Sequence, residues 1–298
     1  MSVKYISYCS QRLANDSWVL LPFWKDHIAR FDRDVKENLE NAPALLSTVP
    51  LSVFGATLLD TKKYYPRARS FLPIMAEDTI QRAWTGSTGT DLLETSISFV
   101  QQTLGFCSQQ LGGVRHDMTI LDFGVGWGRI ARLWLKYLPP GNVKGCDAWE
   151  KSINLAKGCG LKNQIVQSDP MLTVLPFPEG SFDLVYAMSI FTHLDEVAFT
   201  SCFRGISKMI KQGGGFLFTV RPNVFWEVLR SDLTDHALLS RTPGFVFKHG
   251  SFDPRFGDTT VDLEWLDKLA KSCDLKIVGV EWSPSDAMQV IIQMTKLH

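Results

Sequence analysis

The stretch ILDFGVGWGR, residues 120–129, decides the fold of this chain. Its first residues are apolar and typical of a buried strand, and its last residue opens the amphipathic segment RIARLWLKYL at 129–138. Gly124, Gly126 and Gly128 stand between the two. Because glycine allows a tight turn and a close approach of backbone to a ligand, the pattern predicts a strand, a ligand-binding loop and a helix.

Short apolar segments alternate with helical segments around this loop. The predicted strands are 118–123, 143–147, 164–168, 182–189 and 216–220. The predicted helices between them are 129–138, 150–159 and 196–211. A helix at 262–273 and two strands at 275–282 and 287–296 follow, and their short connection predicts an antiparallel pair. Such alternation is typical of a doubly wound α/β fold, a mostly parallel sheet covered by helices on both faces.

Two segments fall outside this alternation. Residues 1–90 mix aromatic, proline and charged residues with helical stretches such as 25–40, and we expect a helical lid or substrate segment there. Residues 91–298 then form the main domain, which begins with a helix at 91–111. The insertion at about 222–258 is rich in proline and aromatic residues and too long for an ordinary connection, so we expect a second part of the lid.

Composition removes several classes of function. Lys plus Arg and Asp plus Glu both number 31 among 298 residues, and this balance lacks the basic footprint of a nucleic-acid binder. No apolar stretch approaches the roughly 20 residues needed to cross a bilayer. The six cysteines are scattered without a CxxC pair, so we expect reduced thiols in a cytoplasmic protein, without a metal site.

Acidic residues follow the predicted strands and indicate the ligand. A dinucleotide loop reads GxGxxG, but the third glycine position is Arg129, and Asp122 has the wrong sign for a pyrophosphate. Asp122 suits a cationic ligand, and S-adenosylmethionine (SAM) carries a sulfonium and an ammonium. Asp147 ends the second strand, where an acid accepts hydrogen bonds from ribose hydroxyls, and Asp169 follows the third strand, where it could hold an adenine amino group.

These residues resemble the class I SAM-dependent methyltransferase family, in its small-molecule branch. The resemblance rests on ILDFGVGWGR (120–129), CDAWE (146–150), LPFPEGSFDLVYAMSIFTHL (175–194) and IKQGGGFLFTV (210–220). In the last of these, Gln212 replaces the proline of the usual LKPGG. The resemblance implies SAM as cofactor and a seven-stranded sheet of order 3-2-1-4-5-7-6 with the last strand antiparallel.

The resemblance also places cofactor contacts residue by residue. It implies a methionine end at Asp122, Gly124, Val125 and Gly126, a ribose and adenine end at Asp147, Ala148, Trp149, Asp169 and Pro170, and a sulfonium site at Met188, Ser189 and the nearby His193. The segment WTGST at 84–88, with Trp84 and Thr85, could complete the wall at the methionine end.

Methyl transfer needs alignment of the acceptor and exclusion of water, and it needs a base only where the acceptor must lose a proton. His193, just past the fourth strand, is the candidate base, although it could instead orient a loop. Arg221 after the fifth strand is a candidate anchor for an anionic substrate group, or else the partner of a nearby acid. In the insertion, His249, Asp253 and Asp258 are polar candidates, and the aromatic wall candidates are Phe245, Phe247, Phe252 and Phe256.

The sequence therefore predicts SAM-dependent methylation of a small molecule such as a sugar, lipid or secondary metabolite. The alternatives are a non-enzymatic SAM-fold protein that binds the cofactor or a partner protein, and a nicotinamide oxidoreductase, which Arg129 disfavours. The substrate, the acceptor atom and the oligomeric state remain open.

Overall fold

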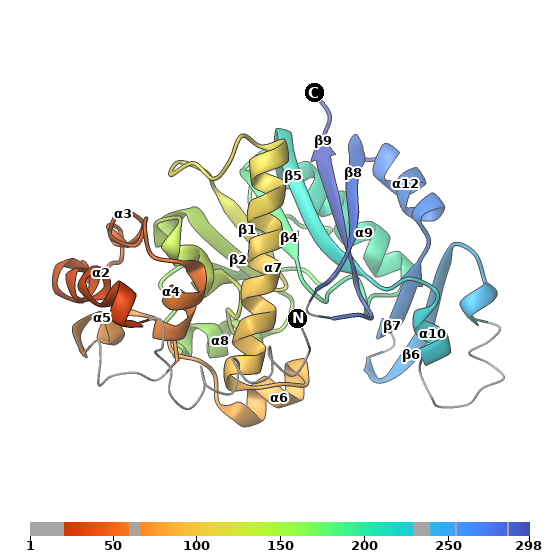
Figure 1. The fold of residues 1–298 in the computed structure, drawn as a ribbon. Helices are drawn as coiled ribbons and strands as arrows, with labels where there is room; N and C mark the ends of the chain where they lie inside the picture. The colour runs from red at the N-terminus through yellow and green to blue at the C-terminus, as the bar shows by residue number, and fades with distance from the viewer. Residues whose placement is uncertain (1–20, 60–65, 229–238, 254, 285) are drawn as a thin grey trace.

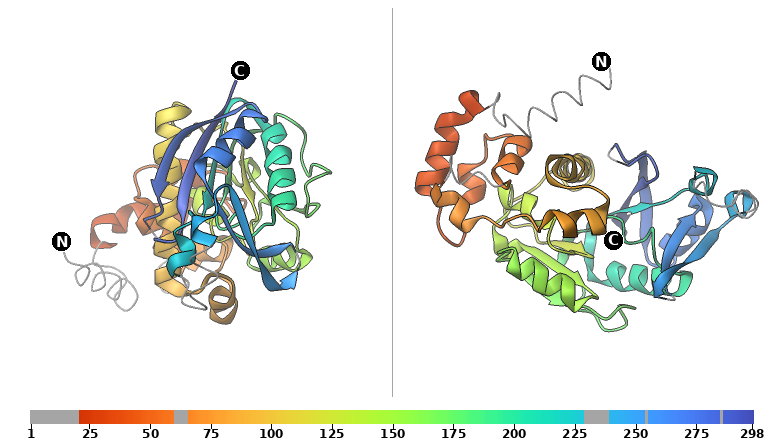
Figure 2. Two further views of the ribbon diagram at one scale, coloured as in Figure 1. Left: turned by 90° about the vertical axis from the view of Figure 1, so that its right-hand side faces the viewer. Right: turned by 90° about the horizontal axis from the view of Figure 1, so that it is seen from below.

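The structure, a computed structural model, describes residues 21–59, 66–228, 239–253, 255–284 and 286–298 (Figure 1). A central sheet carries helices on both faces, in a Rossmann-like arrangement. Two further views show the helices of the N-terminal region on one flank of the sheet and a separate hairpin on the other (Figure 2).

Within the described residues, seven strands form the main sheet. They are β1 (Ile120–Phe123), β2 (Val143–Asp147), β3 (Gln164–Gln167), β4 (Phe182–Ala187), β5 (Ile210–Val220), β8 (Leu275–Trp282) and β9 (Val290–Lys296). Their order is β3-β2-β1-β4-β5-β9-β8, and β9 runs antiparallel to both of its neighbours. The predicted order and the predicted antiparallel last strand are therefore confirmed.

Helices cover the two faces through two separate apolar cores. The first face is covered by α7 (Gly89–Gln110), the 3₁₀ helix η1 (Ala131–Lys136) and α8 (Glu150–Gly158), which share a core with Ile120 and Leu184 of the sheet. The opposite face is covered by α9 (Glu196–Met209) and α12 (Leu263–Lys271), packed on Leu121 and Val185. Neighbouring strand residues thus point to opposite cores, as the two-residue period of a strand requires.

The segment before α7 consists of short helices on the flank of the sheet. They are α2 (Leu21–Asp34), α3 (Ala42–Leu45), α4 (Leu51–Thr57), α5 (Pro66–Phe71) and α6 (Asp78–Thr85). The first four contribute to the same core as η1 and α7, with Phe31 and Phe54 fully buried. Of these helices, α6 lies at the carboxyl edge of the sheet, near α8 (Figure 1). A lid role for residues 1–90 stays a prediction, and α6 is the part placed to serve it.

The insertion after β5 contains regular structure that the sequence reading did not predict. A short helix α10 (Phe225–Val228) is followed by an antiparallel hairpin of β6 (Phe245–Asp253) and β7 (Phe256–Val261). Phe245 packs against Phe199 and Trp265, so it anchors the hairpin instead of lining a pocket. Residues 229–238 and the side chains of Phe252 and Asp253 lie outside the described part.

The main differences from the predicted elements concern the helix at 129–138 and the start of β5. The expected helix at 129–138 is a 3₁₀ helix over Ala131–Lys136, and the carbonyls of Trp127 and Gly128 that precede it accept hydrogen bonds from the Arg132 guanidinium. Strand β5 begins at Ile210, because the glycines at 213–215 continue the strand through a bulge opposite Phe182 and Leu184. A further 3₁₀ turn, η2, spans Pro140–Asn142.

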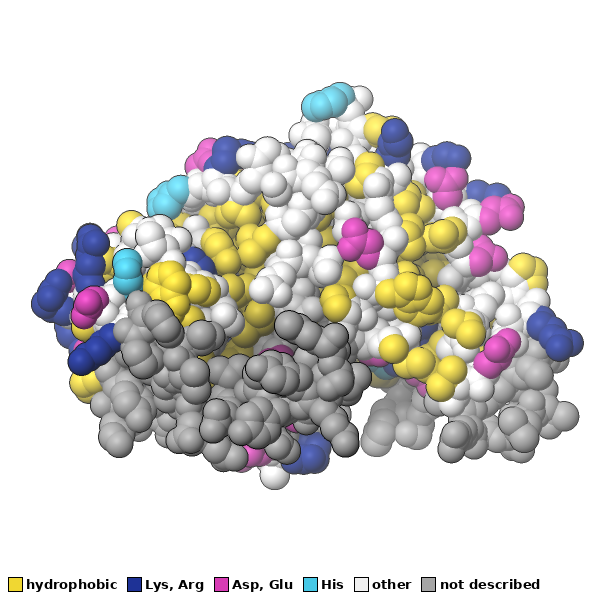
Figure 3. All heavy atoms as spheres, viewed as in Figure 1, with side chains coloured by type: hydrophobic (Ala, Val, Ile, Leu, Met, Phe, Trp, Pro, Cys, Tyr) yellow, Lys and Arg dark blue, Asp and Glu magenta, His cyan; other side chains and the backbone are white. Residues whose placement is uncertain are grey.

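The surface and the thiols agree with the composition. Lys and Arg side chains are interspersed with Asp and Glu on the face shown in Figure 3, without one dominant basic patch. The five cysteines in the described part are buried free thiols. Among the described helices, none is both long and apolar enough to cross a bilayer.

Candidate functional site

The glycine loop turns back on β2 at the carboxyl edge of the sheet. The N–H groups of Gly124 and Val125 donate to the carbonyl of Cys146, at 2.9 and 3.0 Å. Gly124, Gly126 and Gly128 all have positive φ, at 76°, 54° and 82°, which favours glycine. A Cβ at Gly124 would collide with Ile190 and one at Gly128 with Leu161, whereas at Gly126 its nearest neighbour is Trp84 at 3.8 Å. Of the three glycines, Gly126 is therefore the one where a Cβ would meet only ordinary contact, with the Trp84 ring.

Asp122 lies beneath this loop at the end of β1. The residue is 4% exposed, and its Oδ2 has no hydrogen-bond partner among the described residues. Burial raises the pKa of Asp122 to about 7, although the Tyr186 hydroxyl and then the Arg129 charge oppose the rise. An unpaired buried carboxylate is costly, so its presence at a ligand loop indicates a functional group.

Arg129 is a residue that the sequence reading used only to exclude a dinucleotide. Its guanidinium donates to the sulfur of Met188 at 3.1 Å, and burial lowers its pKa to about 10, against the opposing effect of Asp122. It stays a cation beside the Asp122 carboxyl. A charged residue directly after the third glycine was the available signal for this position.

Asp147 fastens the glycine loop from the neighbouring strand. Its Oδ2 accepts from Gly126 N at 2.9 Å and its Oδ1 from Trp149 N at 3.0 Å. Burial raises its pKa, while these backbone donors act in the opposite direction. The Ser152 hydroxyl and the Ala148 N–H also act on this carboxylate and lower its pKa. The predicted ribose role stays a prediction, and the structure adds a role in shaping the loop.

Asp169 is occupied by its own turn. Its carboxylate accepts from the N–H groups of Met171, Thr173 and Val174, at 3.2, 2.8 and 3.3 Å, and from the Thr173 hydroxyl, which lowers its pKa. Pro170 offers no N–H, and its carbonyl lies 3.4 Å from the Cys202 thiol. The adenine role remains a prediction that would have to use the remaining lone pairs.

Thr85 and Ala148 make local contacts. The Thr85 hydroxyl donates to the carbonyls of Gln81 and Ser87, at 2.7 and 3.1 Å, within and just after α6. The Ala148 carbonyl accepts from Gln167 at 3.0 Å. Their predicted cofactor contacts would therefore use atoms other than the Thr85 hydroxyl hydrogen and the Ala148 lone pair that are engaged here.

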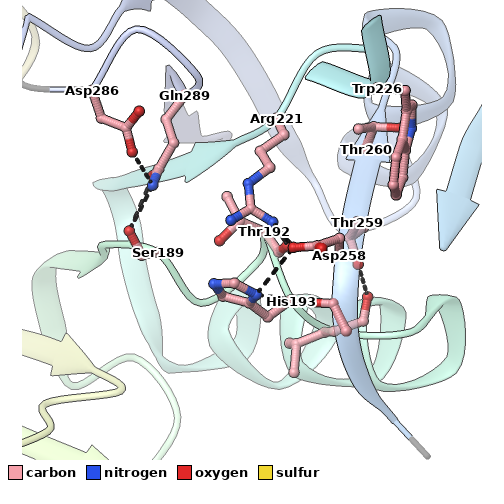
Figure 4. Close-up of polar contacts among 12 residues, drawn as sticks. Ser189, Thr192, His193, Arg221, Trp226, Asp258, Thr259, Thr260, Asp286 and Gln289 are labelled. Carbon is pink, nitrogen blue, oxygen red and sulfur yellow. Dashed lines mark hydrogen bonds and ion pairs between the residues drawn. The ribbon is translucent and has the colours of Figure 1, made fainter. Parts of the chain in front are cut away.

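The residues after β4 are held in an unusual conformation by a partly buried polar network (Figure 4). Ser189 has a φ of 58°, and its N–H donates to the Thr219 hydroxyl at 2.7 Å. Its hydroxyl lies 2.8 Å from Nε2 of Gln289, which also donates to Asp286 at 2.8 Å. Strain of this kind is typical of functional sites. Thr219, Gln289 and Asp286 were not predicted, because strands β5 and β9 bring them to Ser189 only in the fold.

His193 and Arg221 meet beside the turn end of the hairpin, at Gly257 and Asp258 (Figure 4). The His193 Nδ1 lies 2.7 Å from the carbonyl oxygen of Gly257 and 3.9 Å from Asp258. The Arg221 Nη1 donates to Asp258 at 2.5 Å and to the Thr192 carbonyl at 2.8 Å. Burial, followed by the Arg221 charge, lowers the pKa of His193. Arg221 thus has the acidic partner that was the alternative to a substrate anchor.

Strand β7 is paired directly with the segment after β4. Gly257 N donates to His193 O at 2.8 Å and Thr259 N to Thr192 O at 3.0 Å. Asp195 N donates to Arg255 O at 3.0 Å. These bonds fix the hairpin over the end of β4, where a lid would stand.

Four rings from four separate segments form a continuous line, which we call the aromatic row: Trp84, Trp149, Phe256 and His193. Successive ring centroids lie 6.4, 5.9 and 4.8 Å apart. Phe256 and His193 are nearly parallel, at 17°. The row brings two predicted residues of the cofactor end into contact with the hairpin and with the candidate base.

Comparison with known proteins agrees with this geometry. Residues 121–218 match the family described as a methyltransferase domain. The prediction of a SAM-dependent methyltransferase agrees with this match, which spans about a third of the chain. SAM is the cofactor of this family, as the motifs predicted.

The similar proteins are distant. An uncharacterized methyltransferase of Schizosaccharomyces pombe is 24% identical over 188 residues, which cover 59% of this chain and 65% of that protein. A sterol 24-C-methyltransferase of Gibberella zeae is 32% identical over 110 residues, 35% of this chain and 28% of that protein. The chain thus spans less than two thirds of the length of these relatives.

A solved SAM-dependent methyltransferase from Clostridium acetobutylicum has a TM-score of 0.53 at 14% identity, and it covers 74% of this chain and 97% of that one. A second solved SAM-dependent methyltransferase, from Leishmania major, has a TM-score of 0.51 at 15% identity, covering 74% and 79%. At these identities the likeness concerns the fold.

Proposed function

We propose that this chain transfers the methyl group of SAM to a small-molecule acceptor. The observation that carries the proposal is the buried carboxylate of Asp122, unpaired at Oδ2, beneath a glycine loop that Asp147 holds in place. The sterol methyltransferase relatives support a small-molecule acceptor, because the shared 110 residues are similar to enzymes named for a sterol substrate.

The charges at the glycine loop suit the amino-acid end of SAM. That end carries an ammonium and a carboxylate, and the loop offers an anion, Asp122, beside a cation, Arg129. A ligand ammonium would supply the donor that Asp122 Oδ2 lacks. Asp147 would then accept hydrogen bonds from the ribose hydroxyls. The donor set present therefore fits this cofactor.

Bound SAM supplies an electrophilic methyl carbon, and the sulfur keeps the bonding electron pair when that carbon is transferred. The residues of the chain have three tasks: to align the acceptor, to exclude water and to take a proton where the acceptor carries one. We place His193 in the last task. Its Nδ1 faces the Gly257 carbonyl, which accepts but cannot donate, so Nε2 holds the lone pair.

Titration calorimetry with SAM tests the cofactor, and a methyl-release assay over sugars, lipids and aromatic metabolites tests the reaction. We expect binding of SAM and turnover of at least one acceptor. Binding without turnover of any acceptor would favour the non-enzymatic alternative, and tight NADH binding without SAM binding would contradict the proposal.

A further inference from the structure

The aromatic row crosses the carboxyl edge of the sheet above the glycine loop. Strands β2 and β4 flank β1 in the sheet. Trp149 follows β2, His193 follows β4, and Phe256 contacts both rings. Phe256 therefore lies across the end of β1, where the glycine loop begins, and it is carried there by the hairpin.

The rings of the row are only partly covered. Trp149 is 53% exposed, the His193 side chain is 24% exposed, and Trp84 and Phe256 are partly exposed. Single exposed hydrophobic residues are ordinary, but a continuous line of them at a ligand edge marks a binding surface. Ring faces bind flat aromatic partners by offset or edge-to-face contact.

His193 adds one defined polar feature to this surface. The Gly257 carbonyl fixes the proton on Nδ1, so Nε2 is a hydrogen-bond acceptor. The lowered pKa of His193 keeps the ring neutral near pH 7. Asp258 and Arg221, the nearby charged groups, are paired with each other. The ligand therefore meets rings and one acceptor, which suits a flat molecule with one O–H donor better than a polyhydroxylated sugar.

We propose that Phe256 is a specificity-determining residue that selects a planar aromatic acceptor, whose hydroxyl donates a hydrogen bond to Nε2 of His193. The inference rests on the proposed function and names the substrate class of that same site. A phenolic hydroxyl also matches an imidazole base better than an alkyl hydroxyl does. The pKa of a phenol, about 10, lies nearer to the pKa of histidine than the pKa of an alkyl hydroxyl does.

The test compares three small probes that differ in one property each. 2-Naphthol is flat and has a donor, decahydro-2-naphthol keeps the hydroxyl without the flat ring, and 2-methoxynaphthalene keeps the ring without the donor. Their binding is measured by quenching of tryptophan fluorescence and by calorimetry, with and without saturating S-adenosylhomocysteine. The variants are Phe256→Leu and, as a matched control on the same hairpin, Phe247→Leu, whose ring lies beside His249.

We expect 2-naphthol to bind more tightly than either other probe. Phe256→Leu should weaken its binding by about 2- to 12-fold, the factor of an aromatic pair, and leave decahydro-2-naphthol binding unchanged. Phe247→Leu should behave as the parent protein. In ¹⁵N spectra, 2-naphthol should shift the Nε2 signal of His193 more than the Nδ1 signal.

Equal binding of 2-naphthol and decahydro-2-naphthol, no binding of 2-naphthol, or equal losses in the two leucine variants would overturn the inference. Failure of the proposed function is a different result, because it would appear as an absence of S-adenosylhomocysteine binding. The naphthol comparison decides the acceptor class with or without that ligand.

Discussion

Replacing Asp122 with asparagine should stabilise the free protein and lower its affinity for SAM. Burial raises the pKa of Asp122 from 3.8 to about 7. Between these values the folded protein holds a proton that the unfolded chain has released. The unfolded state then binds fewer protons, so the free energy of unfolding falls as the pH rises through this window.

The size follows from the same numbers. A difference of roughly three pKa units, at 1.36 kcal/mol each, costs the folded state about 4 kcal/mol at pH 8 and about 2 kcal/mol at pH 5.5. Asparagine has nearly the same shape and no charge, so its advantage over aspartate should grow by about 2 kcal/mol between pH 5.5 and pH 8.

Urea unfolding of both proteins at the two pH values measures this difference. Calorimetry at pH 8 should show weaker SAM binding to the variant, because the carboxylate that faces the ammonium is gone. In the parent protein, SAM affinity should rise with pH up to about 7 as Asp122 loses its proton. A stability difference that is constant or shrinks with pH would refute the reasoning, as would unchanged SAM affinity in the variant.

Three further changes test other contacts. Asp147→Ala should weaken SAM binding in calorimetry by about 1.5–3 kcal/mol, the value of a hydrogen bond to a charged group. Replacement of the exposed Asp117 by alanine, the control, should leave SAM affinity unchanged. Equal SAM affinities of the two variants would mean that the ribose lies elsewhere. His193→Ala should lower turnover and leave SAM affinity unchanged. In the parent protein, turnover should decline only below pH 6.5, because the pKa of His193 is lowered. Turnover at the parental rate in this variant would contradict the role of His193 as the base. Arg132→Met should reduce the free energy of unfolding by at least about 3 kcal/mol, since buried carbonyls lose their donor. Arg115→Met, the control, should reduce it by less than about 1 kcal/mol. Similar losses for the two variants in urea unfolding would contradict the stabilising role of Arg132.

The parts of the fold that follow from local pattern were predictable. Strand β2 was placed at both ends, and α8 and α9 were placed to within two residues, because the periods of buried strands and amphipathic helices are visible in short windows. The hairpin was missed although Phe245, Val246 and Phe247 are residue types that favour strands, because prolines and many aromatics suggested an irregular lid.

The site was predictable where a residue follows a strand directly, as Asp122 and Asp147 do. It was not predictable where partners come from distant segments. The Ser189–Gln289 contact joins residues 100 apart, and Phe256 reaches Trp149 from the hairpin. The contacts of Asp169 were not predictable either, since its carboxylate is bonded to the turn that follows it, and its adenine role stays a prediction.

The contacts of the Arg132 side chain have a consequence for truncated fragments of this protein. Its guanidinium binds the carbonyls of Trp127 and Gly128 on one side and the carbonyl of Ile74 on the other, and Ile74 N donates to Cys159 O at 2.8 Å. The backbone around residue 74 therefore acts as a brace behind the cofactor loop. A fragment trimmed to the segment that matches other methyltransferases would lose this brace, so low affinity in such a fragment would reflect the cut and would say nothing about the intact protein.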